Sequence, residues 1–198
     1  TGGMGAISPS PYENQNLKKK ILNDILIPVA ESMKKEGNPY NGILYAGLML
    51  TKSGPKLIEF NCRFGDPEAQ AILPRMQTDI LSLIFSSLNE KKLPALKWRH
   101  KFSVTVVLAS KGYPKKYIKN TKIDFIPNTD DFPYSILFHS GTSFNYKKEI
   151  IASGGRVFSV TGFGNDINSA RINSYKLVNC IKWSNGYFRN DIAKDFVS

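Results

Sequence analysis

The residues best suited to chemistry lie in one short stretch, 59–68, which reads EFNCRFGDPE. Side chains alternate along a strand, so Glu59 and Asn61 are expected on one face, roughly 6–7 Å apart along the chain. A carboxylate and an amide oxygen side by side are ligands of the kind that Mg²⁺ takes together with phosphates. The stretch therefore predicts a metal site, while spacing alone is equally compatible with an ordinary surface strand that carries polar residues.

More charged residues follow at short intervals. Arg63 comes two positions after Asn61 and so faces nearly the same way, where its guanidinium can fork onto a carboxylate or a phosphoryl group. Asp66 and Glu68 lie just past the strand end, where α/β enzymes often place ligands. A metal, a phosphate and a pre-oriented cation are together the means of phosphoryl transfer.

Two strands and a short helix must position these residues. The almost wholly apolar run 42–50 predicts a strand buried on both faces, and 57–61 predicts the next strand after a hairpin-like turn. Asp66 is expected to cap a short helix with Pro67 in its first turn. Pro74 is expected to interrupt that helix.

The rest of the first half is expected to be helical. Residues 1–11 predict a loop, and 14–36 predict a helix because apolar residues recur there at every fourth position. Pro28 should kink or split this helix, and Gly37 should end it. A further helix is expected to begin near Thr78, run through Leu88 and fade at 90–92.

Proline and charge at 93–100 mark a boundary, which predicts two domains, 1–97 and 98–198. Beyond it the sequence becomes strand-rich. The expected elements are strands 102–109 and 136–139, a glycine-turned hairpin of 150–152 with 156–161, and one helix, 167–181, capped by Asn165 or Asp166. The expected fold class is α+β.

Composition limits the class of protein. The chain has 27 Lys+Arg and 16 Asp+Glu, a net charge of +11, with 41% hydrophobic and 22% charged residues, which excludes wholesale disorder. The scattered lysines leave a basic nucleic-acid-binding module as a rival class, with lysines and aromatic residues interleaved in 111–132. The sequence contains no apolar run of about 18 residues, the length that a membrane-spanning helix needs. Two cysteines are too few for a disulfide scaffold and favour a cytoplasmic protein.

The residues as a set resemble a known family. The run 59–68 looks like the metal-binding strand and following loop of the phosphoribosylamine–glycine ligase (glycinamide ribonucleotide synthetase) family, which consists of ATP-grasp enzymes of purine synthesis. The opening TGGMGA with Ser8-Pro9 is similar to the glycine-rich loop of that family. Further similar runs follow in order at 40–49 (YNGILYAGLM), 138–142 (FHSGT), 154–157 (GGRV) and 188–192 (FRNDI).

The resemblance implies both a fold and a reaction. The fold would be the later part of an ATP-grasp core, an antiparallel sheet with helices, followed by a small strand-rich C-terminal domain with one main helix. The reaction would join glycine to 5-phosphoribosylamine through a glycyl phosphate, giving glycinamide ribonucleotide, ADP and phosphate. Other ATP-grasp carboxylate–amine ligases or carboxylases share the E-x-N-x-R pattern and remain a closer alternative.

Roles carry over by position. Glu59 and Asn61 would hold Mg²⁺ or Mn²⁺ bridging the phosphates of the co-substrate ATP, and Arg63 would neutralise charge on the acyl phosphate. Asp66 and Glu68 would contact a substrate amine. Backbone amides of the glycine-rich loop would bind a phosphate or carboxylate; the residues of that loop are Thr1, Gly2, Gly3, Met4 and Gly5.

The chain also departs from the family pattern. In the family the glycine-rich loop lies well inside the chain, and the preceding domain and the lid with its nucleotide-binding lysine have no counterpart here. The sequence, which opens on Thr1 without an initiator Met or an apolar leader, is therefore expected to be part of a longer enzyme. Its partner would be the N-terminal region of that enzyme, and the 198 residues alone are expected to be inactive.

Overall fold

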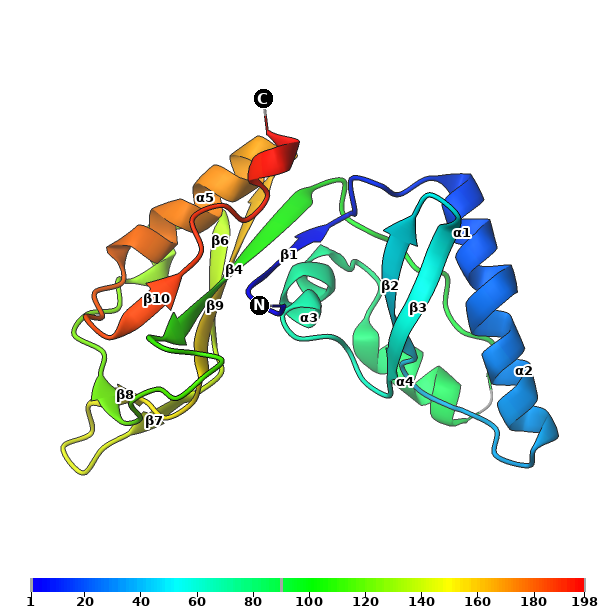
Figure 1. The fold of residues 1–198 in the computed structure, drawn as a ribbon, viewed down its shortest axis with the longest axis horizontal. Coiled ribbons are helices and arrows are strands. Elements are labelled where there is room, and N and C mark those ends of the chain that lie inside the picture. Colours follow the sequence, from blue (N-terminus) through cyan, green and yellow to red (C-terminus); the bar gives the residue numbers. More distant parts are fainter. Residues whose placement is uncertain (1, 90, 198) are drawn as a thin grey trace. The chain divides into compact units, whose positions relative to one another are not determined.

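The computed structural model describes residues 2–89 and 91–197. The fold is α+β, as expected, and the paired strands run antiparallel (Figure 1). The chain forms two compact units. Unit 1 comprises the described residues of Thr1–Pro11, Asp66–Arg75 and Arg99–Ser198, and unit 2 comprises those of Tyr12–Gly65 and Met76–Trp98.

Unit 1 is built on one antiparallel sheet with the order β1-β4-β9-β6, in which β10 also pairs with β4. Its strands are β1 (Gly5–Ser8), β4 (Phe102–Ser110), β6 (Ser135–His139), β9 (Arg156–Gly164) and β10 (Gly186–Phe188). The central strand β4 is buried along almost its whole length, which confirms the strand predicted at 102–109.

The first strand corrects the loop expected at 1–11. Gly5 to Ser8 pair with Val106 to Ser103, so β1 extends the sheet along one edge of β4. Glycine-rich composition predicts turns, but a strand edge elsewhere in the chain supplies the missing backbone partners.

Helix α5 (Ile167–Cys180) packs on this sheet (Figure 1). Its N-cap is Asp166, one of the two caps expected from the sequence, and Ser169 completes a capping box. The helix backbone lies directly against β9 at Gly162, where an added Cβ would be 2.2 Å from the Ser174 backbone nitrogen. The buried Ser174 hydroxyl accepts a bond from the Gly162 N–H (2.8 Å) and donates one to the Val104 carbonyl (2.5 Å).

The hairpin expected around the 153–155 turn is wrong. A second sheet with the order β5-β8-β7 contains β5 (Thr121–Lys122), β7 (Thr142–Phe144) and β8 (Ile150–Ala152). Strand β8 pairs with β5 and β7, whereas β9 pairs with β4 and β6. Gly154 lies against Gly141, where its Cβ would be 2.9 Å from the Gly141 Cα, so the glycines permit a close backbone crossing between two sheets.

The remaining elements of unit 1 are short. Helix α3 (Glu68–Ile72) gives way to a 3₁₀ turn, η2 (Leu73–Arg75), which confirms the interruption at Pro74. Two further 3₁₀ turns, η3 (Thr129–Asp131) and η4 (Lys194–Phe196), complete the unit.

In unit 2 the long helix is continuous through residues 15–35, and its hydrogen-bond pattern changes just before Pro28. Helix α1 (Gln15–Ile21) continues into a π-helical turn, η1 (Leu22–Leu26), before α2 (Ile27–Lys35), with Pro28 at the start of α2. The missing proline N–H therefore coincides with the change in hydrogen-bond pattern. Gly37 follows the helix end with φ +80°, as a helix stop requires.

The other half of unit 2 is a hairpin and a helix. Strands β2 (Tyr45–Thr51) and β3 (Gly54–Asn61) pair through a tight turn, and α4 (Ile80–Leu88) is capped by Asp79. The expected burial of β2 on both faces is wrong, because none of its residues is buried. Among the described residues of unit 2 the one buried residue is Gly65, so this unit has no buried apolar core of its own.

Large apolar side chains are accordingly exposed on unit 2. Ile58 is 64% exposed, Phe85 66% and Leu88 71%. Within the described parts of the chain, no helix has the length and the apolar character needed to span a membrane.

Candidate functional site

The strand end of β3 brings Glu59 and Asn61 together. The Asn61 Nδ2 donates a hydrogen bond of 3.0 Å to Glu59 Oε1, so the two side chains lie on one face, as strand alternation predicts. Glu59 is exposed and Asn61 is half-buried. Both therefore reach solvent from a paired strand rather than from a loop.

A glycine on the neighbouring strand makes room for the carboxylate. Gly47 pairs with Glu59, and a Cβ at Gly47 would be 3.1 Å from Glu59 Cγ. The register of the two strands shifts between Gly47 and Leu48, which identifies an irregularity of the kind that re-aims side chains near functional sites. Gly47 was not a predicted site residue; a glycine inside the strand run 42–50 was the signal for it.

The donor set fits a hard divalent cation. Glu59 offers carboxylate oxygens and Asn61 an amide oxygen, which a rotation of the amide group would present beside the carboxylate. Among the described residues no group of three or more His, Cys, Asp or Glu side chains could hold a metal. A cation here would thus depend on phosphate oxygens and water for its other ligands, which is how Mg²⁺ is commonly bound.

Arg63 lies just beyond β3 and is exposed, with Nη1 donating to the Phe64 carbonyl at 2.8 Å. The preceding Cys62 is exposed as well. Cys62 lies beside Tyr40, where partial burial and then the thiol raise the pKa of the Tyr40 hydroxyl. That hydroxyl donates to the Ile43 carbonyl at 2.7 Å.

A second cluster in unit 1 is organised by Arg156, at the start of β9. Its Nη2 forms an ion pair with Asp66 Oδ2 at 2.9 Å. Its Nη1 donates to the Asp66 carbonyl at 2.5 Å and to the Gly3 carbonyl at 3.2 Å. Gly3 has φ +74°, and a Cβ there would be 2.7 Å from Arg156 Nη1. One guanidinium therefore ties the glycine-rich loop to the loop before α3.

The expected helix cap at Asp66 is wrong. Its Oδ2 is paired with Arg156, and its Oδ1 accepts a bond from Gln70 Nε2 at 3.1 Å. Pro67, which was expected in the first turn, is itself the N-cap residue of α3 and makes no side-chain capping bond. The Gln70 Oε1 is buried and has no hydrogen-bond partner among the described residues. Neither Arg156 nor Gln70 was a predicted site residue; the GGRV run was the signal for Arg156.

The other predicted substrate-binding residues divide by burial. Gly2 is exposed, whereas Met4 is 4% exposed and packs with Val107, Ala109 and Tyr113, so its side chain belongs to the core. Gly5 already lies in β1, Glu68 is half-buried in the first turn of α3, and Thr1 lies outside the described residues.

The structure thus groups the predicted residues into two clusters. Gly3 and Asp66 meet at Arg156 in unit 1. Glu59 and Asn61 meet on β3 in unit 2, and Arg63 follows them.

Comparison with known proteins identifies the family. Residues 1–69 match the ATP-grasp (A) domain of phosphoribosylglycinamide synthetase, and residues 103–195 match the C domain of the same enzyme. The domain boundary expected at 97/98 falls in the unmatched segment and stays a prediction.

Curated relatives agree. The chain is 45% identical over 197 residues to the phosphoribosylamine–glycine ligase of Caldanaerobacter subterraneus and 42% identical over 195 residues to that of Agrobacterium fabrum. These matches cover 99% and 98% of this chain but 46% and 45% of the relatives. A Vigna unguiculata relative is 40% identical over 94% of this chain and 61% of its own length. The chain therefore spans about half the length of the curated relatives it matches.

Solved structures show the same relation. The phosphoribosylamine–glycine ligase of Thermotoga maritima superposes with a TM-score of 0.84 at 30% identity, over 98% of this chain and 47% of that one. An N5-carboxyaminoimidazole ribonucleotide synthetase from Thermus thermophilus shares the fold. Its TM-score is 0.60 at 14% identity, over 90% of this chain and 42% of that one. With two domains of one enzyme matched in order along nearly the whole sequence, the chain belongs to the phosphoribosylglycinamide synthetase family of ATP-grasp proteins.

Proposed function

We propose that this chain is the later part of a phosphoribosylamine–glycine ligase, which uses ATP to join glycine to 5-phosphoribosylamine. The products are glycinamide ribonucleotide, ADP and phosphate. The observation that carries the proposal is the pairing of Glu59 with Asn61 at the end of β3, directly ahead of Arg63, in a chain of this family. That order of carboxylate, amide and guanidinium suits an enzyme that binds a metal-bound nucleotide and a developing acyl phosphate.

Glu59 and Asn61 are the proposed ligands of Mg²⁺ or Mn²⁺. When bound, such a cation neutralises charge on the phosphates of ATP. The chain contributes the exposed Glu59 carboxylate and the neighbouring amide of Asn61, whose mutual hydrogen bond holds both side chains toward one point. Gly47 keeps the opposite strand clear of the carboxylate.

Arg63 is the proposed catalytic cation. In the reaction the glycine carboxylate attacks the γ-phosphate, ADP leaves, and the amine of phosphoribosylamine then displaces phosphate from glycyl phosphate. A planar guanidinium pairs with two oxygens of a phosphoryl group at once. The bond from Arg63 Nη1 to the adjacent Phe64 carbonyl uses one of its five N–H groups and leaves the fork usable.

The unit 1 cluster is the proposed substrate-binding part. The glycine-rich loop of Thr1–Gly5 would offer backbone amides to a phosphate or carboxylate, and Glu68 and Asp66 would contact an amine. Arg156 supports this assignment because it fixes both the Gly3 carbonyl and Asp66. Asp66 accepts one bond on each oxygen and retains further lone pairs for a substrate.

The proposed partner is the N-terminal region of the same enzyme. Unit 2 exposes Ile58, Phe85 and Leu88, and among its described residues no apolar side chain is buried. An absence of buried apolar side chains together with many exposed ones favours contact of this unit with another surface. We propose that the rest of the ATP-grasp domain covers them in a cytoplasmic enzyme, with 1–97 belonging to that domain and 98–198 to the C-terminal domain. The 198 residues alone would then show no turnover.

A chimera tests the function. These residues replace the corresponding part of the Caldanaerobacter ligase, and ADP release is measured with glycine or phosphoribosylamine omitted in turn. ADP release that needs both substrates, and that Glu59→Gln reduces at least about 100-fold, supports the proposal. Lys56→Gln, on the same strand, is the control and should leave the rate unchanged.

The alternatives predict different results. ADP release that depends on bicarbonate and not on glycine would identify an ATP-grasp carboxylase. Salt-sensitive RNA or DNA binding that is indifferent to Glu59→Gln, with no ADP release, would favour the nucleic-acid-binding module.

A further inference from the structure

Unit 1 contains a cavity of about 680 Å³ that the proposed reaction does not use. It lies where β4 begins and β9 ends, since its lining includes Lys101, Phe163 and Gly164. The Arg156 cluster lies at the opposite end of β9, a nine-residue strand, and a rise of about 3.3 Å per residue places the two roughly 26 Å apart. A volume of this size lies within the range of small-molecule sites.

Three cationic side chains line the cavity: Arg75, Arg99 and Lys101. No aspartate or glutamate is among the described lining residues. Asp166 follows the lining residue Asn165 in the chain, but its carboxylate is engaged at the α5 N-terminus, where Oδ1 accepts from the Ser169 N–H at 2.7 Å. Arg99 and Lys101 therefore face no carboxylate among the described lining residues, which favours an anionic ligand.

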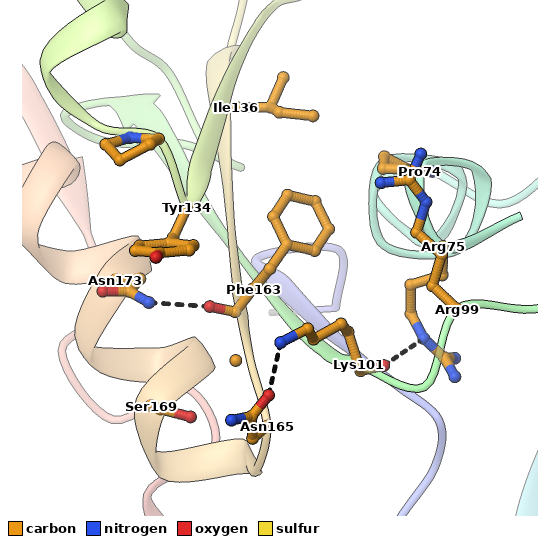
Figure 2. A pocket seen from close by; sticks show the side chains of 12 residues that line it. Pro74, Arg75, Arg99, Lys101, Tyr134, Ile136, Phe163, Asn165, Ser169 and Asn173 are labelled. Atoms are coloured by element: carbon orange, nitrogen blue, oxygen red, sulfur yellow. Dashed lines mark hydrogen bonds between the residues drawn. The ribbon is translucent and has the colours of Figure 1, made fainter.

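Two of these cations are held in place. Arg75 Nε donates to the Lys101 carbonyl at 2.6 Å, and its Nη1 donates to the buried Ser8 hydroxyl at 2.6 Å. Lys101 Nζ donates to Asn165 Oδ1 at 2.5 Å, which leaves two ammonium protons for a ligand (Figure 2). Holding side chains in advance lowers the entropy cost of binding.

The other lining residues include polar side chains of α5 and the loop before it (Asn165, Ser169 and Asn173) and an apolar part with two aromatic rings. Figure 2 shows the Phe163 ring between Ile136 and the arginine side chains, with Tyr134 on the other side of the strand end. Tyr134 is 63% exposed and Ile136 38% exposed, so both are accessible to a ligand. Aromatic faces beside cations suit a planar ring that carries a negative group.

We propose that this cavity is a second ligand site, which binds a small organic monophosphate with a planar ring, such as a nucleoside monophosphate. The phosphate is placed by Lys101 and Arg99, and the ring lies against Phe163 and Tyr134. Inorganic phosphate would make no contact with the apolar side chains, and an uncharged ring would make no ionic contact with the cations. The site belongs to unit 1 alone and does not depend on the proposed ligase reaction.

Calorimetric titration of the 198-residue chain tests this. The probes are adenosine 5′-monophosphate, adenosine and inorganic phosphate, all with a chelator present so that divalent cations contribute nothing. We expect saturable binding of the monophosphate, at least about fivefold tighter than either other probe. Glu59→Gln should leave this binding unchanged, which separates it from the nucleotide site of the proposed ligase.

Variants locate the binding. Arg99→Gln and Lys101→Gln should each weaken the monophosphate at least about fivefold, and Tyr134→Ala at least about threefold, while Lys116→Gln, a basic control elsewhere in unit 1, should have no effect. All four positions are exposed, so the folded state is expected to survive, and circular dichroism verifies it. Absence of saturable binding would overturn the proposal, as would equal binding of inorganic phosphate or indifference to all three cavity variants.

Discussion

Replacement of Arg156 by alanine should loosen the glycine-rich loop and destabilise unit 1. The variant loses the ion pair to Asp66 Oδ2 (2.9 Å) and the bonds to the carbonyls of Asp66 (2.5 Å) and Gly3 (3.2 Å). These contacts link three segments that are far apart in the sequence. Their loss therefore affects the positions of both proposed substrate-binding loops.

The exposure of the two side chains limits how much unfolding free energy Arg156→Ala removes. The Arg156 side chain is 26% exposed and that of Asp66 44%, so solvent screens the ion pair, which is worth at most about 1 kcal/mol. The two bonds to carbonyls contribute about 1 kcal/mol each. The expected loss is about 2–3 kcal/mol. For a chain of this size that lowers the melting temperature of unit 1 by about 5–10 °C.

Tryptophan fluorescence can follow this unit separately. Trp183 is 8% exposed in unit 1, and Trp98 belongs to unit 2, so a Trp98→Phe background leaves one reporter for unit 1. Arg156→Lys keeps the charge but not the fork and should recover about half of the loss. Arg189→Ala is the matched control, because it breaks only a local pair with Asp191. An Arg156→Ala melting temperature within about 1 °C of the parent would show that these contacts do not stabilise unit 1.

Three further predictions concern the scaffold. Gly162→Ala should destabilise unit 1 by at least about 3 kcal/mol in urea unfolding, because the added Cβ would lie 2.2 Å from the α5 backbone. Gly2→Ala is the control, since a Cβ there meets nothing within 4 Å and should leave the stability unchanged. Hydrogen bonds from the backbone and then the hydroxyl of Ser169 lower the pKa of Asp166. The stabilising effect of its carboxylate is therefore present above the unfolded pKa of about 3.9 and is lost as pH falls through the lower folded value. The difference in melting temperature between the parent and Asp166→Asn should shrink below about pH 4, and a constant difference would contradict this. Gly47→Val should crowd the proposed metal-binding carboxylate and weaken Mg²⁺-dependent nucleotide binding of the chimera at least about fivefold, and an unchanged affinity would exclude a positioning role.

Local rules predicted the elements that depend on neighbours in sequence. The Asp166 cap, the change of hydrogen-bond pattern before Pro28 and the stop at Gly37 each follow from one residue's hydrogen bonding or backbone geometry. Two of the incorrect expectations involve distant partners. Strand β1 exists because β4 offers an edge, and the hairpin at 153–155 fails because β8 and β9 pair in different sheets.

In the candidate site, too, local rules predicted contacts between sequence neighbours and missed contacts between distant residues. Strand alternation was enough to place Glu59 beside Asn61. The cap expected at Asp66 fails because Arg156, which lies 90 residues away in sequence, takes its carboxylate. The burial expected on both faces of the strand at 42–50 fails because unit 2 has no buried apolar core among its described residues. Contacts of that range leave no periodic pattern for sequence reasoning to detect.

We propose that the strand carrying Glu59, Asn61 and Arg63 serves the phosphorylation of glycine. A labelling experiment supplies the chimera with glycine whose carboxylate carries ¹⁸O, and the released phosphate is analysed by mass spectrometry. Transfer through glycyl phosphate moves one carboxylate oxygen into that phosphate, so we expect phosphate heavier by one ¹⁸O, formed only when phosphoribosylamine is present. Glycinamide ribonucleotide formed with unlabelled phosphate would rule out a glycyl phosphate intermediate.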